Sequence, residues 1–382
     1  MKEYDVIIVG GGASGLYLAA SLGGRYKTAV IESGARVGRK LSATGGGQGN
    51  LSNADISAER YFGDRRVIAS VLGDRPHAVL GMFDGLLTTD ARGRMYPAGR
   101  QASALTDCLR KKAALNADIM TDTRVTDIRR GFIIETSAGA MKAKRVALCT
   151  GGKAGKNFGT DGSSYALATC LGHTVTSLYP SLVQLKTDDR RIRTLRGVRV
   201  DCKVTAHCGG EMAAENAGEV IFGDGVVGGS AIYYISPFIA GKKNCELTLS
   251  FLPEFTEEQI ARDVRRKMRE GAERIELLAL TLNNVLGRAI IRSVSGGAEE
   301  IAHAVKNFTL KICGDAGFEN AQVTRGGVPL SEVTDGLESR FVKGLHFAGE
   351  VLDVDGECGG YNLHWAWASA RRVAESIAED LR

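Results

Sequence analysis

The 382-residue sequence lacks the features that mark a metal protein, a disulfide-stabilised protein or a membrane protein. Its eight cysteines form no Cys-x-x-Cys pair and no Cys/His cluster at zinc spacing, so neither a disulfide framework nor a metal site is expected. No apolar run reaches the length of a membrane span, and the N-terminal residues show no signal-peptide pattern. We expect a cytoplasmic protein that does not contact membranes and whose cysteines are mostly small buried residues.

A strong excess of charge of one sign is also missing. The formal net charge is +5, and the basic residues are scattered apart from short runs such as residues 190–193, so nucleic-acid binding is not expected. Residues 262–269 are interpreted as the solvated face of a helix rather than as a polyanion-binding patch. With 44% hydrophobic and 24% charged residues, the composition is that of a globular protein long enough for two or three domains.

Glycine, in contrast, is abundant, and its 49 residues are nearly twice the usual share of about 7%. Residues 10–15 read Gly-Gly-Gly-Ala-Ser-Gly, between an apolar run typical of a buried parallel strand and a helical stretch. In that setting Gly10 permits a tight turn, Gly12 lets the backbone approach a pyrophosphate, and Gly15 lets helix and strand pack closely. The free N–H groups and the dipole of the helix would face the phosphates.

A second apolar strand, residues 28–31, supports this interpretation because it ends in Glu32. An acid about 20 residues beyond the glycines is expected to accept hydrogen bonds from ribose hydroxyls. The sequence therefore predicts a dinucleotide-binding unit. The alternative is a structural turn followed by a surface glutamate.

The rest of the chain indicates that this unit is interrupted and then completed by the C-terminus. Residues 33–53 resemble a loop that wraps a ligand. A strand at 145–149 stops at residues 150–152, Thr-Gly-Gly, where the backbone can lie against a cofactor at the carboxyl ends of a parallel sheet. Other expected elements are helices at 64–87, 100–117 and 162–171, strands at 119–121, 123–129 and 132–136, a final strand at 344–349 and an amphipathic helix at 361–381.

The middle of the chain has a different pattern. Short alternating strands are expected at 182–185, 198–207, 219–222 and 246–251, followed by helices over 256–305, the first with an N-terminal cap at 256–259. We therefore predict an α/β protein with a discontinuous Rossmann-like domain, residues 1–185 and 325–382. An inserted domain, residues 186–324, would be β-rich over about 186–254 and helical over about 255–324, and would supply the substrate side.

Motifs spread over the whole chain carry a resemblance to a known family. Besides the turn at 10–15 they are GRKLSATGGG (38–47), NLSN (50–53), TGG (150–152), GGV (326–328), FAGEVLDVDG (347–356) and GGYNLHWAW (359–367), of which the last is the most specific. In these motifs the chain resembles the HI0933-like, or BaiN-like, NAD(P)/FAD-dependent oxidoreductases. The resemblance implies a flavoprotein fold of the two-dinucleotide-binding type, distantly similar to the succinate dehydrogenase and fumarate reductase flavoproteins, with noncovalent FAD.

The resemblance also implies where FAD would lie. The turn at 10–15 would hold the pyrophosphate, Glu32 the adenosine ribose, and the backbone at Val125 the adenine. Arg39 and Lys40 would lie along the phosphates and ribityl chain, where cations oppose the negative charge. The full set of implied contacts is Gly10, Gly12, Ala13, Ser14, Gly15, Glu32, Ser33, Arg39, Lys40, Thr44, Gly45, Gly46, Gly47, Asn50, Val125, Thr150, Gly151, Gly152, Gly349, Glu350, Gly359, Gly360, Tyr361 and Asn362.

At the flavin end, residues 44–47 would run beside the isoalloxazine ring and Glu350 would bind the ribityl chain. Residues 359–362 would open the last helix at the pyrimidine end, where a helix N-terminus stabilises the negative charge of a reduced flavin and raises its reduction potential. The alternative is a turn that feeds a surface helix. Gln48-Gly49 stands where the family usually has Arg-Cys, so a cation and a thiol are missing near the flavin. The absence of a close cysteine pair near the first turn argues against a flavin-disulfide mechanism.

Because flavin supplies the electron chemistry, the protein needs only to position a substrate and deliver a proton. Cys358 is a candidate redox or proton-donating thiol, and Tyr361 and His364 are candidate proton donors; each has a structural alternative. Arg325 is the candidate anchor for a substrate carboxylate or carbonyl. No second complete Gly-x-Gly-x-x-Gly turn follows a strand, so NAD(P)H, if it is the donor, would visit the flavin face transiently.

The sequence thus favours an FAD-dependent oxidoreductase that transfers hydride at flavin N5 to or from a small organic substrate, with a conjugated C=C bond as one candidate. The alternative is a flavin-binding redox sensor or regulatory protein without a metabolite substrate. A tRNA- or protein-modifying enzyme would need a basic face that a net charge of +5 does not suggest. The oligomeric state is left open.

Overall fold

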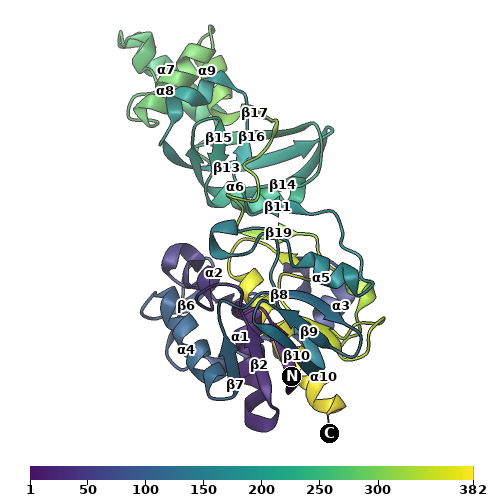
Figure 1. Cartoon of the computed structure of the whole chain (residues 1–382). Coiled ribbons are helices and arrows are strands. Elements are labelled where there is room, and N and C mark those ends of the chain that lie inside the picture. Colours follow the sequence, from purple (N-terminus) through teal and green to yellow (C-terminus); the bar gives the residue numbers. More distant parts are fainter. Residues whose placement is uncertain (382) are drawn as a thin grey trace. The chain divides into compact units, whose positions relative to one another are not determined.

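The computed structural model describes residues 1–381, and the chain divides into two compact units (Figure 1). The first unit combines Met1–Tyr179 with Gln322–Arg382, and the second is Pro180–Ala321. In sequence order, the second unit is therefore inserted into the first. That each unit is an independent domain, with the boundaries predicted at 185/186 and 324/325, stays a prediction.

A mainly parallel sheet forms the centre of the first unit, as the Rossmann-like prediction requires. Its order is β7-β2-β1-β10-β9-β8, with β20 paired to β10, and β7, β2, β1, β10 and β20 run parallel. All four residues of β2 are buried, as in strands covered on both faces. The strands are β1 (Lys2–Val9), β2 (Thr28–Ile31), β7 (Ala117–Met120), β8 (Val125–Arg129), β9 (Ile133–Thr136), β10 (Gly139–Leu148) and β20 (Leu345–Phe347).

The parallel strands end in register at one edge of this sheet. The pairs at this edge are Val9 with Ile31, Val9 with Leu148, Ile31 with Met120, and Leu148 with Phe347. The residues that follow, among them Gly10, Glu32, Thr150 and Gly349, therefore lie along one edge, where doubly wound sheets bind their ligands.

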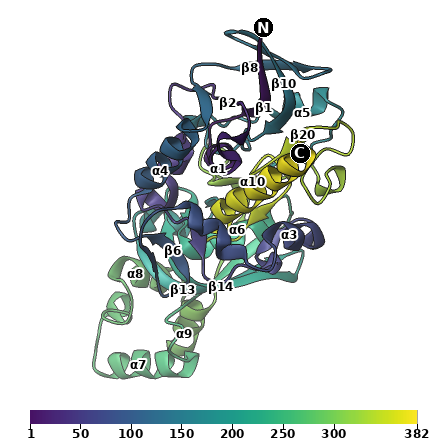
Figure 2. The same ribbon diagram turned by 90° about the horizontal axis from the view of Figure 1, so that it is seen from below.

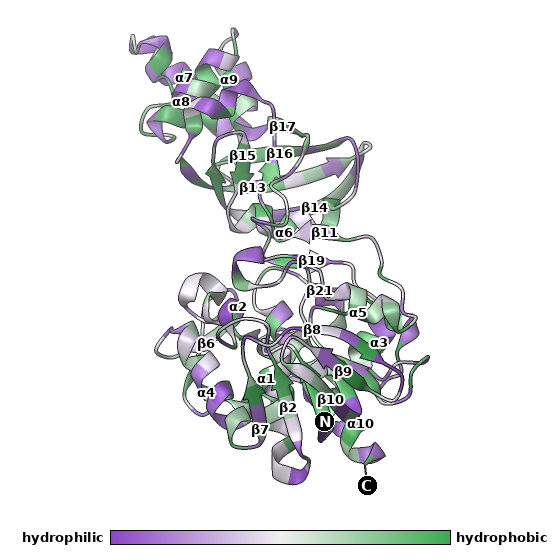
Figure 3. Cartoon of the chain, in the orientation of Figure 1, coloured by the Kyte–Doolittle hydropathy of each residue, from purple (hydrophilic) through white to green (hydrophobic). Residues whose placement is uncertain are grey.

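Two helices that are far apart in the sequence pack together in this unit. They are α1 (Ala13–Leu22) and α10 (Tyr361–Asp380), and Figure 2 shows them side by side. The hydropathy colouring marks α1 and β2 as hydrophobic, in keeping with their burial (Figure 3). The remaining elements are α2 (Arg39–Ser42), α3 (Arg65–Leu72), α4 (Ala102–Ala114), α5 (Tyr165–Cys170), β3 (Ser52–Asn53), β4 (Tyr61–Phe62), β5 (Leu87–Thr89), β6 (Arg94–Pro97), β19 (Val323–Arg325) and β21 (Asp355–Gly356).

The second unit contains a separate antiparallel sheet in the order β17-β16-β13-β14-β15-β12-β18. Helix α6 packs on β14, and α7 packs on α9. The bounds are β12 (Leu185–Lys186), β13 (Arg199–Cys208), β14 (Glu211–Phe222), β15 (Val226–Gly228), α6 (Ser230–Ile239), β16 (Cys245–Phe251), α7 (Glu257–Arg269), α8 (Asn284–Ser293), α9 (Ala298–Lys306), β17 (Phe308–Ile312) and β18 (Gly314–Asp315). Strand β11 (Tyr179–Ser181) crosses the boundary between the units in sequence. The expected cap of α7 is present as a reciprocal pair between Thr256 and Gln259.

Several details of the sequence prediction are wrong. The single helix expected at 64–87 ends at Leu72, because Gly73 takes the left-handed φ of +65° and Pro76 starts a separate 3₁₀ turn. Helix α6 was not expected. Cys208 and Cys245, which lie opposite each other on β13 and β16, form a disulfide, and Cys170 and Cys313 are exposed rather than buried.

Within residues 1–381, none of the helices combines the length and the apolar character that a membrane crossing requires.

Candidate functional site

The glycine turn after β1 has the geometry that its sequence predicts. Gly10 has a φ of +106°, and a Cβ there would lie 2.4 Å from the carbonyl oxygen of Cys149. A Cβ on Gly15 would lie 1.9 Å from the carbonyl oxygen of Gly10, so the start of α1 touches the turn itself. A Cβ on Gly12 would meet no protein atom within 4 Å. Gly10 and Gly15 are therefore required by the fold, whereas Gly12 borders open space.

Open space beside Gly12 coincides with the start of a helix. Gly12 is the N-cap residue of α1, no side chain caps the helix, and its first turn carries no acid. The positive end of the helix dipole is therefore available to an anion outside the protein. Ser14, by contrast, is buried and donates to the carbonyl of Ala348 at 3.2 Å, which ties α1 to the end of β20.

Glu32 lies beside this turn at the end of β2. Its Oε2 accepts from the backbone N–H of Gly11 at 2.9 Å, and its Oε1 accepts from that of Gly34 at 2.7 Å. Its backbone carbonyl accepts from Thr123 N, which brings the approach to β8 and Val125 to the same place. Oε1 also accepts from the hydroxyl of Ser33 at 3.4 Å, whereas Oε2 accepts one hydrogen bond and keeps a lone pair, so Glu32 can still accept from a sugar hydroxyl.

Lys40 and Glu350, predicted as separate ligand contacts, are paired with each other. Lys40 Nζ lies 2.7 Å from Glu350 Oε2 and donates to the carbonyl of Ala154 at 3.0 Å. Glu350 Oε1 accepts from Thr324 N at 2.9 Å, and the Thr324 hydroxyl accepts from the backbone N–H of Ala154 at 2.9 Å. This polar network fixes four distant segments at the carboxyl edge of the sheet. Arg39 lies apart from it and donates to the carbonyl of Asn157 at 2.7 Å.

Two hydroxyl groups near this network have no protein partner among the described residues. The Thr150 Oγ1 follows β10 at the sheet edge, and the Tyr165 hydroxyl belongs to α5; both atoms are buried. Burial raises the pKa of Tyr165, and the nearby Glu350 and Asp353 carboxylates add to that rise. Buried hydroxyls are normally hydrogen-bonded. Together with the open position at Gly12, they fit a polar ligand that lies along this edge.

The segment at 44–53 is joined to the start of α10. Gly45 and Gly46 take left-handed φ angles of 58° and 64°. The Asn50 amide, in the orientation that satisfies both of its ends, accepts from Gly360 N at 3.1 Å. A Cβ on Gly360 would lie 2.2 Å from the carbonyl oxygen of Ser52. Gly360 therefore permits a backbone contact between two of the predicted flavin-binding motifs.

The last predicted contacts surround this junction. Asn362 exchanges two hydrogen bonds with the backbone of Gly356, at 2.8 and 2.9 Å, and so braces the preceding loop. Tyr361 is buried, and its ring meets that of Tyr61 edge to face. Gly349 N donates to Ser369 at 2.9 Å, which anchors the end of β20 on α10. Ser33 is exposed, and Gly47 and Gly151 take positive φ angles of 86° and 72° beside this edge.

The four candidate residues for chemistry have different surroundings. Arg325 pairs with the buried Asp355, Nε to Oδ1 at 3.1 Å, and its guanidinium lies 3.8 Å from the centroid of the Phe62 ring. Cys358 is half-buried, and burial raises the pKa of its thiol, so it stays protonated at neutral pH. His364 is fully buried, with Nδ1 2.8 Å from Ser52 Oγ. His364 therefore lies in the interior of the first unit, where it contacts Ser52.

His364 is expected to make the free energy of unfolding fall as the pH is lowered. Burial, with the positive charges of His77 and Arg371, lowers the pKa of His364 from 6.5 to about 3. Between these values the unfolded chain binds the proton and the folded chain does not, so stability that is complete above the unfolded pKa is lost toward lower pH. The expected loss from pH 7 to about pH 5.5 is about 1 kcal/mol. Urea unfolding at both pH values measures this loss of unfolding free energy. If His364→Asn loses as much stability as the wild type, His364 is not its cause.

The sequence did not indicate Thr324, Ser52 or Tyr165 as members of the site. Thr324 stands directly before the Arg325-Gly326-Gly327 motif, which is a signal that could have found it. Ser52 lies within the NLSN motif (50–53), but the motif does not show that its hydroxyl meets His364, and no comparable pattern marks Tyr165. Contact between FAD and the residues predicted to bind it stays a prediction.

The chain is similar to known proteins over nearly its whole length. The family described as HI0933-like protein Rossmann domain matches residues 4–376. A 3-dehydro-bile acid Δ(4,6)-reductase from Clostridium scindens is 35% identical over 402 residues, covering 97% of this chain and 98% of that protein. A ribosomal RNA dihydrouridine synthase from Haemophilus influenzae is 26% identical over 415 residues, covering 99% of this chain and 100% of that protein. The fold is shared with a solved 3-ketosteroid-Δ4-(5α)-dehydrogenase from Rhodococcus jostii RHA1. That structure is 16% identical in sequence and has a TM-score of 0.52, and the match covers 99% of this chain and 97% of that chain.

Proposed function

Because the chain belongs to the HI0933-like family of flavoprotein oxidoreductases, we propose that it reduces a C=C bond conjugated to a carbonyl group in a small organic molecule. FAD, when bound, would supply the hydride. The observation that supports FAD binding is the edge of the sheet, where the uncapped start of α1, the open side of Gly12 and the buried Thr150 hydroxyl are found.

The substrate class is inferred from chemistry that two relatives share. A Δ(4,6) unsaturation in a 3-dehydro-bile acid is conjugated to the carbonyl at position 3, and the reductase from Clostridium scindens is named for acting there. Dihydrouridine is uridine with a saturated bond beside a ring carbonyl, and the relative from Haemophilus influenzae is named for making it. Both names describe saturation of a double bond that a carbonyl polarises, and we infer hydride addition to such a bond for this chain.

We favour a small substrate over RNA for this chain. The relative named for a bile acid is more similar than the one named for ribosomal RNA, at 35% against 26% identity. A net charge of +5 over 382 residues is also modest for a protein that must neutralise many phosphates. Reduction of uridine in ribosomal RNA is the second candidate, and the relative from Haemophilus influenzae is the observation that favours it.

In this proposal the chain's own residues bind and orient the two reactants. The start of α1 and Gly12 would face the pyrophosphate, and Glu32 would accept from the adenosine ribose. Glu350, held by Lys40 and Thr324, would present its carboxylate to the ribityl hydroxyls. Arg325 would bind the substrate carbonyl or a carboxylate, since its guanidinium is oriented by Asp355 and Phe62.

Cys358 is the proposed proton donor to the substrate carbon. Its raised thiol pKa keeps the proton available at neutral pH, and its side chain is not fully enclosed. Cys358→Ser is expected to leave reduction of the flavin unchanged and to slow reoxidation by the substrate about tenfold. Stopped-flow measurement of the two half-reactions checks this. Cys170→Ser, at an exposed thiol of α5, is the matched control; if both variants behave alike, the assignment is wrong.

The donor and the substrate can be tested on the wild-type holoprotein. NADH and NADPH are each mixed anaerobically with it, and the rate of flavin bleaching identifies the donor. The reduced protein is then offered an unsaturated 3-ketosteroid, unmodified ribosomal RNA and oxygen in separate mixtures. We expect reoxidation by the ketosteroid to be the fastest. Faster reoxidation by RNA would favour the second candidate, and slow reoxidation by every acceptor would favour a redox sensor.

A further inference from the structure

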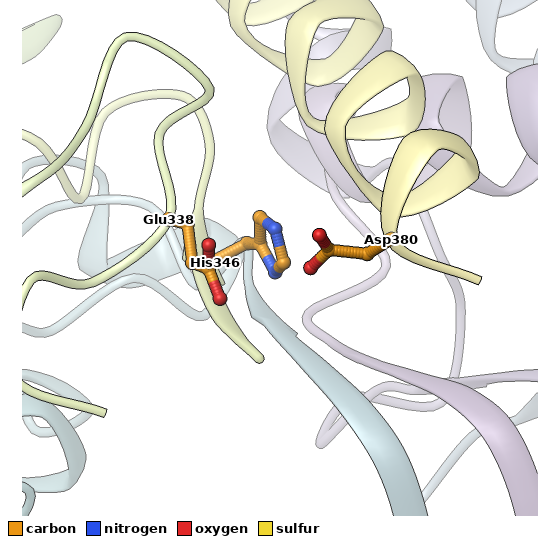
Figure 4. A group of neighbouring side chains, drawn as sticks. All are labelled: Glu338, His346 and Asp380. Atoms are coloured by element: carbon orange, nitrogen blue, oxygen red, sulfur yellow. The ribbon is translucent and has the colours of Figure 1, made fainter. Parts of the chain in front are cut away.

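Three side chains with metal-binding groups meet where α10 ends. They are Glu338, His346 and Asp380 (Figure 4), and one ligand atom from each lies within 4.8 Å of the other two. His346 is on β20, and its backbone forms an antiparallel bridge with Glu338, which places the two side chains next to each other. Asp380 is the last residue of α10. None of the three residues takes part in the proposed reduction.

The imidazole of His346 is buried and has a side-chain partner at one of its two nitrogens. The side chain is fully buried, and its Nε2 lies 3.3 Å from the hydroxyl oxygen of Ser376. Its Nδ1 is buried and has no hydrogen-bond partner within the part of the chain that is described. Ser376 and Asp380 are four residues apart on α10, so they share one face of the helix. A polar partner on one ring nitrogen is the usual arrangement when the other binds a metal.

The carboxylates around the ring have oxygen atoms available to a cation, and their charge favours one. Within residues 1–381, no hydrogen bond joins any two of the three side chains. Glu338 Oε1 accepts from Gly344 N at 2.6 Å, and Asp380 Oδ2 lies 3.5 Å from Arg145 Nε, so each carboxylate retains a second oxygen. The cluster holds two carboxylates, and Arg145 pairs with one of them, Asp380; two negative charges and one positive charge leave an excess of negative charge.

We propose that Glu338, His346 and Asp380 bind one divalent metal ion of the zinc class and that the ion fastens the end of α10 to β20. One imidazole nitrogen and two carboxylate oxygens are ligands that Zn²⁺ accepts, at bond lengths of about 2.0–2.2 Å. Ligand atoms around such an ion lie about 3–3.5 Å apart, so only small side-chain movements are needed. The Asp380 side chain is 31% exposed, which gives the ion a route from solvent and leaves a coordination position for water.

Calorimetric titration of the EDTA-treated holoprotein with ZnCl₂ tests the site. We expect one Zn²⁺ per chain in the wild type and binding weakened about tenfold or more in Asp380→Asn and Glu338→Gln. Glu379→Gln, at the neighbouring exposed carboxylate of α10, is the matched control and should bind like the wild type. If Asp380→Asn and the wild type bind Zn²⁺ equally, the site does not exist.

Thermal unfolding and Co²⁺ spectra give two further readouts that do not depend on activity. Zn²⁺ should raise the Tm of the wild type and of Glu379→Gln by several degrees and leave that of Asp380→Asn unchanged. Co²⁺ at a nitrogen and oxygen site should show no thiolate charge-transfer band. A stoichiometric thiolate band would assign the metal to a cysteine, such as the exposed Cys170 or Cys313, and would overturn the proposal.

Discussion

Replacing Gly12 by valine is expected to leave the chain folded and to lower its affinity for FAD about 100-fold or more. Gly12 has φ −81° and ψ −162°, which other residues adopt without strain, and a Cβ there meets no protein atom within 4 Å. The added side chain would instead fill the space in front of the uncapped start of α1, where the pyrophosphate is proposed to lie. Titration of the FAD-free wild type and of FAD-free Gly12→Val with FAD, followed by fluorescence, gives the dissociation constant of each protein.

The circular dichroism and the urea midpoint of Gly12→Val should match those of the FAD-free wild type. Wild-type affinity in a well-folded Gly12→Val protein would mean that FAD does not approach this turn. The same result would remove the main support for placing the pyrophosphate at α1.

Replacing Gly15 by alanine is expected to lower the free energy of unfolding by about 3 kcal/mol or more. A Cβ at this position would lie 1.9 Å from the carbonyl oxygen of Gly10, which is backbone and cannot rotate away. Helix α1 would have to move off the turn, and its contacts with α10 would loosen. Urea unfolding of the FAD-free protein measures the loss without a contribution from the ligand.

Gly24→Ala provides the comparison for this effect. Gly24 lies just beyond the end of α1, and the nearest atom to its added Cβ is Asn116 Oδ1 at 3.5 Å, an ordinary contact. The free energy of unfolding of Gly24→Ala should differ from that of the wild type by about 0.5 kcal/mol or less. Comparable losses in both variants would show that the close approach at Gly15 is not what the fold requires.

Local patterns in the sequence were sufficient to predict the first strand, turn and helix and the position of Glu32 beside them. The buried strand before Gly10, the helix after Gly15 and the acid at Glu32 are all within about 30 residues, so spacing alone places them. The break at Gly73 and Pro76 was also visible in the sequence, and the helix predicted across it was an error of interpretation.

Other features depend on pairing between distant segments and could not be read from local patterns. The Lys40–Glu350 ion pair joins residues 310 positions apart, and the contact of Gly360 with Ser52 depends on how α10 packs. The Cys208–Cys245 disulfide follows from the register of β13 with β16. Helix α6 contains Pro237 and several β-branched and aromatic residues, so its local preference favours a strand, and tertiary packing on β14 decides otherwise.

Anaerobic reoxidation of the reduced holoprotein by an unsaturated 3-ketosteroid tests the proposed reduction most directly. The flavin is first reduced with one equivalent of dithionite, so the result does not depend on NAD(P)H, and the saturated ketone serves as the control. We predict reoxidation at least about tenfold faster with the unsaturated compound, together with formation of the saturated product. Equal rates with both compounds, in a protein that has bound FAD, would contradict the reduction of a conjugated C=C bond.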